Sequence, residues 1–364
     1  MMKRAGKSRI RKLVVVSATI ACCVILLPLA PALSQTVQQD TVSETLTAQV
    51  GAEDYAAARG ISELRYHMTR AHTRTANNVS PYGPGGLLIA SEAGLLEAPA
   101  VTIQGLSPPC FYPADLSYFG GHTIAVSKSH PVYLSCTPAC WGNPEGFLTD
   151  LSKSAFVHLL DQYVGTTANN RYSIGSRFFV QRTLPHVLGL FRDIIPLAHA
   201  AAKTGGTGYE HIYHIFVPKG IDVCADDPRN MLCYSPDRPS SFLLCAFHFR
   251  VNFSDIGHVL VTVEPFQDVP ECAAQVPSPN GQLADSTNSP LSHELFETIT
   301  DPDVGASWIA AKSLDLHGFE IGDICQPILN AANDFLVPTF LINGKKYEVQ
   351  LEYSNKYHGC TNAP

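Results

Sequence analysis

The first 34 residues constrain the fold most strongly, because they predict the compartment in which the rest of the chain folds. Six basic residues lie within the first twelve positions, and an uncharged apolar run then extends from Leu13 to about Leu33. This order is typical of a secretory signal peptide, and the small residues Ala32 and Ser34 predict cleavage near Ser34. We therefore expect a secreted or periplasmic protein. An uncleaved anchor is the alternative, since the run is about long enough to span a bilayer.

Secretion changes how the cysteines are interpreted. The chain has 11 cysteines; cleavage of the leader removes Cys22 and Cys23, which leaves nine. In an oxidising compartment these should form disulfides, with one thiol left over. The paired Cys-x2-Cys spacing of a zinc ribbon is absent from the sequence. Cys136 and Cys140 are too far apart for a thioredoxin-type redox site, so we expect a structural role for them.

The charge of the mature chain narrows the range of partners. The leader holds six of the 25 basic residues and none of the 32 acidic ones, so cleavage leaves 19 against 32, a net charge of −13. An acidic surface repels phosphate backbones, which makes nucleic acid an unsuitable partner. No second apolar span follows the leader, so we expect no stable membrane span after cleavage.

Composition divides the chain into three parts. Residues 1–34 are the predicted signal peptide, and residues 35–86 are rich in small polar residues, with a Gly/Pro cluster at their end. We interpret 35–86 as a linker or loosely ordered extension. Residues 87–364 are then expected to form a single domain.

Apolar periodicity predicts a mixed α/β fold for that domain, because strand-like and helix-like patterns alternate before several strands follow in succession. The predicted strands are 130–136, 171–182, 210–217, 241–253 and 258–265, and the predicted helices are 143–164, 184–203 and a short one at 292–300. Residues 266–290 are interpreted as a polar loop, and Ser292 as the N-cap of the short helix. Asn343-Gly344 predicts a type I′ hairpin.

The short helix carries the most informative motif, Ser292-His293-Glu294-Leu295-Phe296-Glu297. His293 and Glu297 are one helical turn apart, so an imidazole and a carboxylate can bind one divalent ion. Glu294 points about a hundred degrees away from them, which leaves it able to act as a general base on a water molecule. This is the H-E-x-x-H geometry of zinc peptidases with Glu in place of the second His. Five-residue matches also arise by chance, and many such helices carry only surface charge.

A third metal ligand can come from either of two places downstream. Asp303 follows His293 by ten residues, as in metzincins, although a Met-turn is missing because the last methionine is Met231. Glu320 follows Glu297 by 23 residues, which is nearer to the thermolysin-like pattern. Asp301 is a further candidate at the end of the helix. Zinc is the predicted ion, with calcium as the alternative for an acidic cluster.

The remaining motifs favour no other chemistry. His248 has apolar neighbours and is interpreted chiefly as a core histidine, and His211 and His214 should point to opposite faces of one strand. The G-x-S-x-G, P-loop and G-x-G-x-x-G motifs are absent from the sequence. We therefore expect neither a serine hydrolase elbow nor a nucleotide cofactor.

Several segments, in consistent order from about Gly85 to Cys360, resemble bacterial members of the EXORDIUM-like, or phosphate-induced protein 1, family. These segments are Trp141-Gly142-Asn143-Pro144, Asp161-Gln162-Tyr163-Val164-Gly165, Asn169-Asn170-Arg171-Tyr172, Cys245-Ala246-Phe247-His248, Ser292-His293-Glu294 with Thr300-Asp301-Pro302, Glu320-Ile321-Gly322-Asp323, and Ser354-Asn355 before Cys360. The resemblance implies an exported cell-wall or surface protein. Its plant members have no firmly assigned reaction and look as though they lack the pair that matches His293-Glu294.

Two functions follow as expectations. The first is a secreted, zincin-like metal-dependent hydrolase of peptides or related amides, with Glu294 as general base and His293, Glu297 and one downstream carboxylate as ligands. The second is a non-catalytic extracellular protein that binds a cell-wall or surface polymer.

Overall fold

The computed structural model describes most of the chain beyond residue 113. The described residues are 114–224, 233–235, 244–269, 272–274, 277–312, 317–325 and 337–364, together with the strands at 46–48 and 61–70. The predicted signal peptide and Cys110 lie outside the described residues.

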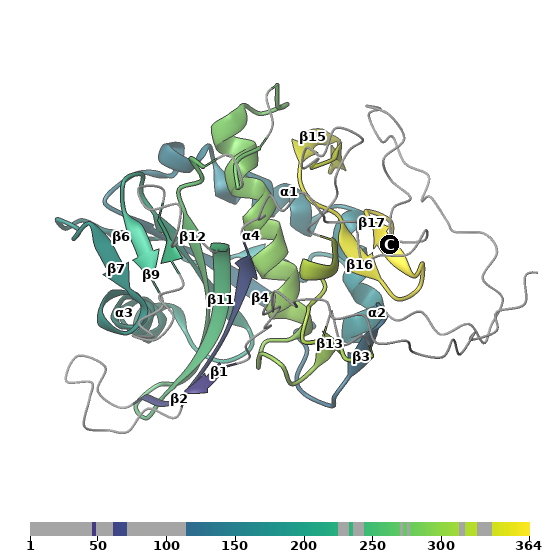
Figure 1. Cartoon of the computed structure of the whole chain (residues 1–364), viewed down its shortest axis with the longest axis horizontal. Coiled ribbons are helices and arrows are strands. Elements are labelled where there is room, and N and C mark those ends of the chain that lie inside the picture. Colours follow the sequence, from purple (N-terminus) through teal and green to yellow (C-terminus); the bar gives the residue numbers. More distant parts are fainter. Residues whose placement is uncertain are drawn as a thin grey trace, which may run out of the picture. The chain divides into compact units, whose positions relative to one another are not determined.

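An eight-stranded mixed sheet forms the framework (Figure 1). Its strands, in spatial order, are β1 (Leu46–Ala48), β2 (Ile61–Arg70), β11 (Leu244–Phe253), β12 (Gly257–Pro265), β8 (His211–Val217), β4 (Ser127–Leu134) and β5 (Tyr172–Ile174), with β6 (Phe178–Val180) also paired to β4. The strands from β12 to β6 run parallel, and β11, β2 and β1 add antiparallel pairs. The predicted mixed α/β class is confirmed.

The smaller strands pair outside this sheet. They are β3 (Leu116–Tyr118) with β13 (Trp308–Ala310), β7 (Val187–Gly189) with β9 (Asp222–Cys224) and β10 (Cys233–Tyr234), β14 (Thr339–Ile342) with β15 (Lys345–Glu348), and β16 (Glu352–Ser354) with β17 (Gly359–Thr361).

The helical elements follow the same chain order. They are η1 (Pro138–Trp141), α1 (Pro144–Ser152), η2 (Phe156–Leu160), α2 (Asp161–Val164), η3 (Leu190–Ile194), α3 (Ile195–Gly205), α4 (Gln282–Thr300) and η5 (Asp323–Cys325).

Side chains alternate across the central strand β8, and each face of the sheet has its own core. Ile212 and Phe216 pack with α1 and α4, whereas Tyr213 and Ile215 pack on the opposite face with α3. A strand that is covered on both faces reads as a continuous apolar run, which is why 210–217 could be recognised in the sequence. The acidic site described below lies on the α4 face.

Helix α4 corrects the largest error of the sequence interpretation. The helix starts at Gln282, ten residues before the predicted start, so Ser292 lies inside it and not at its N-cap. Pro290 is accommodated within the helix. Pro, Ser and Asn within 282–291 are typical of loops and have weak helix propensity. Burial of this part of the helix outweighs that propensity.

Other boundaries also shifted. The predicted helix 143–164 is divided into α1, η2 and α2, although Pro144 does occupy the first turn, with the Asn143 side chain accepting a hydrogen bond from the Gly146 amide. The predicted helix 184–203 begins with strand β7 and a π-helical turn before α3.

The Asn-Gly hairpin is confirmed. Strands β14 and β15 pair antiparallel around Asn343 and Gly344, whose φ angles are 50° and 78°. Positive φ at both central residues is the requirement of a type I′ turn.

Part of the segment 35–86, interpreted as a linker or extension, contributes to the sheet. Strand β2 pairs antiparallel with β11 along nearly its whole length, and β1 pairs with β2. The rest of that segment lies outside the described residues.

Four disulfides connect the eight cysteines that the structure describes. The pairs are Cys136–Cys140, Cys224–Cys233, Cys245–Cys272 and Cys325–Cys360. This confirms the expectation of a disulfide-stabilised fold and indicates an oxidising environment outside the cytoplasm. Among the described residues, no helix is both long and apolar enough to cross a membrane.

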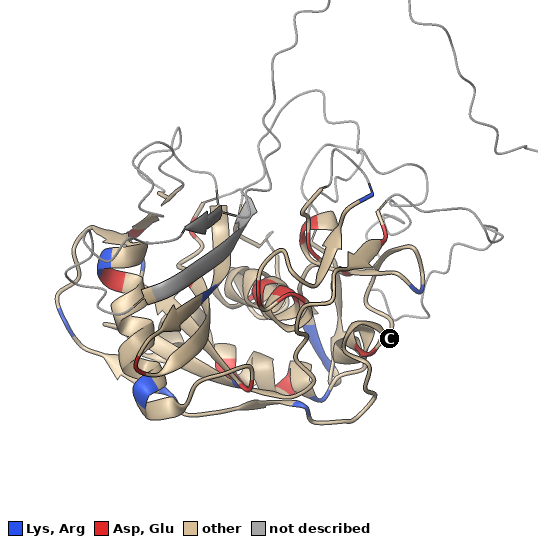
Figure 2. Ribbon diagram, turned by 90° about the horizontal axis from the view of Figure 1, so that it is seen from below, with Lys and Arg blue, Asp and Glu red and all other residues tan. Residues whose placement is uncertain are grey.

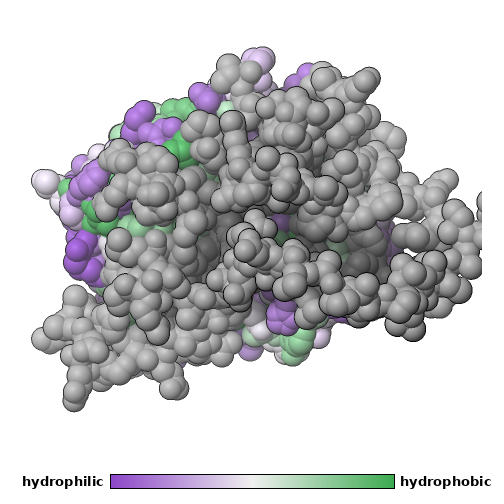
Figure 3. All heavy atoms as spheres, viewed as in Figure 1, coloured by the Kyte–Doolittle hydropathy of each residue, from purple (hydrophilic) through white to green (hydrophobic). Residues whose placement is uncertain are grey.

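Charged residues are few on the visible ribbon, and acidic ones recur on the central helix (Figure 2). On the face seen in Figure 3, hydrophilic and hydrophobic side chains are interspersed over β6, β7 and β9.

Candidate metal centre

The predicted motif lies in the interior of the molecule. His293, Glu294 and Glu297 project from the C-terminal half of α4 and have no exposed surface. The same helix anchors itself in the core through its apolar side chains, Leu291, Leu295, Phe296 and Ile299. Packing of that apolar face therefore holds the polar face of α4 against the sheet and the loop at 320–325.

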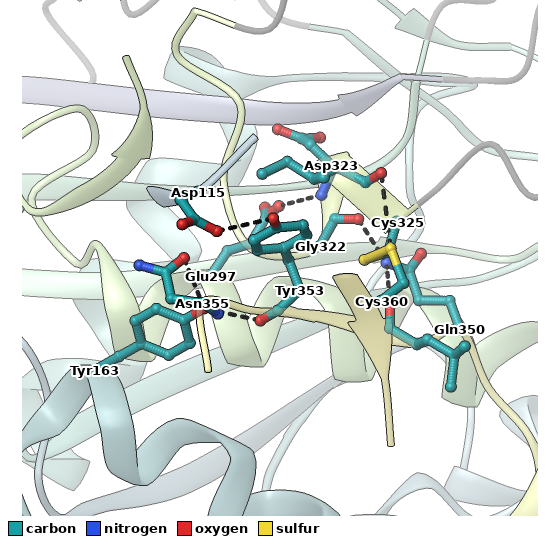
Figure 4. The surroundings of a disulfide bond; sticks show 12 residues. Asp115, Tyr163, Glu297, Gly322, Asp323, Cys325, Gln350, Tyr353, Asn355 and Cys360 are labelled. Atoms are coloured by element: carbon teal, nitrogen blue, oxygen red, sulfur yellow. Dashed lines mark hydrogen bonds between the residues drawn. A yellow bond between two sulfur atoms is a disulfide. The ribbon is translucent and has the colours of Figure 1, made fainter. Parts of the chain in front are cut away.

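His293 and Glu297 are close enough to share an ion. The Nε2 atom of His293 lies 3.0 Å from Oε1 of Glu297, and Oδ1 of Asp323 lies 3.9 Å from the same nitrogen. The backbone amide of Asp323 donates a hydrogen bond of 3.2 Å to Oε1 of Glu297, as Figure 4 shows. The one-turn spacing predicted from the motif is therefore present in the structure.

A second imidazole enters the site from the sheet. His248 on β11 places Nδ1 3.2 Å from Oε2 of Glu294 and 3.5 Å from Oε2 of Glu297. Its other nitrogen, Nε2, lies 3.5 Å from Oε2 of Glu320. His248 is therefore surrounded by carboxylates on both sides of its ring.

Two groups of three residues have the spacing of metal ligands, and Glu297 belongs to both. One consists of His248, Glu297 and Glu320, and the other of His293, Glu297 and Asp323. Within each group, one ligand atom per residue lies within 4.8 Å of the others. Ligand atoms around a tetrahedral ion with bonds of 2.0–2.1 Å are about 3.4 Å apart, and the separations of 3.0 Å between His293 and Glu297 and 3.5 Å between His248 and Glu297 are close to that value.

Further carboxylates surround these groups. Glu352 on β16 is fully buried, and neither of its carboxylate oxygens has a hydrogen-bond partner among the described residues. Glu264 on β12 is also buried and accepts a hydrogen bond of 2.7 Å from Thr262. Buried carboxylates are costly unless they are protonated or bound to a cation.

The imidazoles favour the charged state despite their burial. Burial alone lowers the pKa of His248, but hydrogen bonds with Glu294 and then Glu297 outweigh it and raise the pKa to about 9. Burial likewise opposes the charging of His293, and the neighbouring Glu297 raises its pKa well above the usual value. Both shifts report the strong negative potential of the site.

Burial also disfavours the charged form of the carboxylates, and their mutual repulsion adds to this effect. Burial raises the pKa of Glu320 well above its usual value, and Asp301 and Glu297 raise it further. Burial also raises the pKa of Glu352 well above normal, and burial together with Glu294 raises that of Glu264 to about 8. Without a cation, these buried carboxylates favour their protonated forms.

The candidate third ligands are placed differently from one another. Glu320 lies in the site beside His248, whereas the carboxylate of Asp301, at the end of α4, accepts hydrogen bonds from the amides of the loop at 305–307. Asp303 forms an ion pair with Arg250 at 2.8 Å and accepts a hydrogen bond from Tyr209. The geometry therefore brings Glu320 to His248 and pairs Asp303 with Arg250 and Tyr209 instead.

Four participants were not assigned to the site from the sequence. His248 was interpreted chiefly as a core histidine, and Asp323 was noted only as part of an acidic cluster. Glu264 and Glu352 were not singled out. A polar residue within an otherwise buried strand was the available signal for His248 and Glu264, because such a residue needs a partner.

The loop that carries Glu320 and Asp323 is fixed from the C-terminal side. The Cys325–Cys360 disulfide joins it to β17, and the side-chain amide of Gln350 donates a hydrogen bond to the carbonyl of Gly322 (Figure 4). The amide of Tyr353 donates to the carbonyl of Ile321. These contacts preorganise the loop against α4.

The chain matches no family model, no curated protein and no solved structure.

The donor set indicates which ions suit the site. Imidazole nitrogen and carboxylate oxygen together suit Zn²⁺, Mn²⁺ and Fe²⁺, whereas Ca²⁺ prefers oxygen ligands alone. The residues present have the spacing to hold a metal ion.

Proposed function

We propose that this chain is an extracellular metal-dependent hydrolase, with a zincin-like division of roles on α4. His293 and Glu297 hold the ion together with Asp323, and Glu294 serves as the general base. The observation that carries the proposal is the burial of two imidazoles against four carboxylates, those of Glu294, Glu297, Glu320 and Asp323.

The excess of carboxylates favours catalysis over a purely structural ion. A closed structural site needs only about four ligands, and every additional buried carboxylate destabilises the fold. Groups with strongly shifted pKa values that are kept at such a cost cluster at functional sites.

Each side chain has a defined task in this proposal. A bound divalent ion polarises the scissile carbonyl and lowers the pKa of water. Glu294 takes a proton from water, and His248, 3.2 Å from its Oε2 atom, orients that carboxylate. The buried surroundings strengthen these electrostatic interactions.

Substitution of the proposed base tests this function. We expect metal-loaded protein to cleave fluorescent casein or members of a peptide library, and Glu294→Gln to lower the rate by about 10²- to 10⁴-fold with the metal retained. The exposed Glu210→Gln is the matched control and should be fully active. An equally active Glu294→Gln would remove Glu294 from its role.

A second candidate is a non-catalytic protein that binds a cell-wall polymer, as the resemblance to EXORDIUM-like proteins implies. Tyr118 is half exposed, and its ring centroid lies 5.0 Å from that of Trp308, which forms an aromatic surface on β3 and β13. Exposed aromatic surfaces often mark binding sites. Co-sedimentation with insoluble cell-wall polysaccharide that is lost in Tyr118→Ala, with no hydrolysis of any peptide, would favour this candidate.

A further inference from the structure

The two oxygens of the Glu297 carboxylate face different imidazoles. Oε1 lies 3.0 Å from Nε2 of His293, and Oε2 lies 3.5 Å from Nδ1 of His248. A carboxylate that presents one oxygen to each of two metal-ligand groups has the geometry of a bridge. Two ions bridged in this way are typically about 3.5–4 Å apart.

Each side of Glu297 has its own set of ligands. Glu320 completes the group with His248, and Asp323 completes the group with His293. These two carboxylates lie three residues apart on one loop, so the chain supplies one terminal carboxylate to each side. A single ion would use only one of the two sets.

Glu352 is an independent sign that the site is incomplete without a cation. Its side chain is fully buried, and both of its oxygens lack a hydrogen-bond partner among the described residues. Among neighbouring groups it interacts most strongly with His293, followed by Glu297 and Asp323. A buried carboxylate without a partner at this position is suited to be a further ligand on the His293 side.

We propose that the site binds two divalent transition-metal ions, one held by His248 and Glu320 and the other by His293 and Asp323, with Glu297 bridging them. This inference rests on the proposed metal-dependent function and deepens it, because His248, which would hold one of the two ions, also lies 3.2 Å from Glu294. The mixed nitrogen and oxygen donors favour Mn²⁺, Fe²⁺ or Zn²⁺ over Ca²⁺.

Metal stoichiometry tests the inference directly. Full-length secreted protein is stripped with a chelator, reloaded with Mn²⁺ or Zn²⁺, desalted and measured by elemental analysis against protein concentration. We expect two ions per chain in the native protein and one in each of Asp323→Asn and Glu320→Gln. Glu297→Gln should bind less than one, and the control Asp303→Asn should still bind two.

A spectroscopic measurement on the native protein does not depend on the folding of any variant, and Asp323→Asn then serves as a comparison. The electron paramagnetic resonance spectrum of native Mn²⁺-loaded protein should show the exchange coupling of a closely spaced pair, and the Asp323→Asn spectrum that of an isolated ion. One ion per chain with an uncoupled spectrum would overturn the dinuclear inference. If hydrolysis dependent on Glu294 persisted in that case, the proposed function would stand without the second ion. Two coupled ions without any hydrolysis would support the dinuclear site and contradict the proposed function.

Discussion

His248 and Glu294 are 46 residues apart in the sequence, yet Nδ1 of the histidine lies 3.2 Å from Oε2 of the glutamate in the protein interior. The contact joins the sheet to helix α4 at the point where the carboxylates gather. Both side chains are fully buried, and an unpaired charge in the interior is costly. The imidazole and the carboxylate therefore each supply the opposite charge that the other needs.

Removal of this imidazole should therefore be costly. We expect His248→Ala to lower the free energy of unfolding by about 3–5 kcal/mol, since it leaves buried carboxylates without their cationic partner. The variant should also bind less metal. Urea denaturation and elemental analysis measure the two effects, with the half-exposed His186→Ala, expected to lose about 1 kcal/mol or less, as the control. An unchanged metal content in His248→Ala would exclude His248 from the centre.

Gly322 offers a steric test of the site that removes none of the proposed ligands. A Cβ atom added there would lie 2.4 Å from Nδ1 of His293, so the imidazole must shift. We expect Gly322→Ala to weaken metal affinity at least tenfold, because ligand geometry tolerates only small displacements. Isothermal titration with Zn²⁺ measures this effect.

The matched control for this test is Gly165→Ala. Its added methyl group meets nothing within 4 Å, although its φ of 71° makes the variant less stable by about 1–2 kcal/mol. A loss of stability with unchanged Zn²⁺ affinity is expected for Gly165→Ala. The opposite pattern, with affinity lost in the control and kept in Gly322→Ala, would argue against the packing of Gly322 on His293.

The Cys325–Cys360 disulfide should matter more than the Cys136–Cys140 disulfide. Their cysteines are 35 and 4 residues apart, so loop-closure entropy predicts losses of about 4 and about 2 kcal/mol when each pair is replaced by alanines. The longer one also fixes the loop that carries Glu320 and Asp323. Metal content should therefore fall in Cys325→Ala/Cys360→Ala and stay constant in Cys136→Ala/Cys140→Ala, as elemental analysis can determine.

Local patterns in the sequence were sufficient for parts of the fold. The apolar run of β8 and the Asn343-Gly344 turn depend on neighbouring residues alone, and both were predicted correctly. The start of α4 was not, because the burial that keeps Pro290 in a helix comes from distant parts of the chain.

The candidate site, too, could be predicted only where its residues are close together in the sequence. The His293–Glu297 pair follows from helical periodicity, so it was visible in the sequence. His248 and Glu352 reach the site from two strands far apart in the chain, and no local spacing could have joined them to α4. The sheet topology that brings β11 beside α4 is what the sequence pattern could not supply.

A histidine pair away from the metal site should make the fold sensitive to acid. His130 lies with Nδ1 3.2 Å from the carbonyl of Ser176 and Nε2 3.0 Å from Nδ1 of His211. With both rings neutral, Nδ1 of His130 donates to the carbonyl, and Nε2 accepts from His211. The pKa of His130 is lowered from 6.5 to about 4, chiefly by burial; the hydrogen bond to Ser176 acts against this shift, and unfavourable interactions of a charged ring with His211 and Lys128 add to it.

The sign of the pH dependence follows from this depressed pKa. Between pH 6.5 and 4 the unfolded chain binds a proton at His130 that the folded chain does not, so stability is complete above about pH 6.5 and falls as the pH is lowered. The loss reaches about 3 kcal/mol near pH 4. His130→Gln, which does not titrate, should lose correspondingly less stability over this range in urea denaturation. Parallel curves for His130→Gln and the native protein would show that the acid sensitivity comes from other groups.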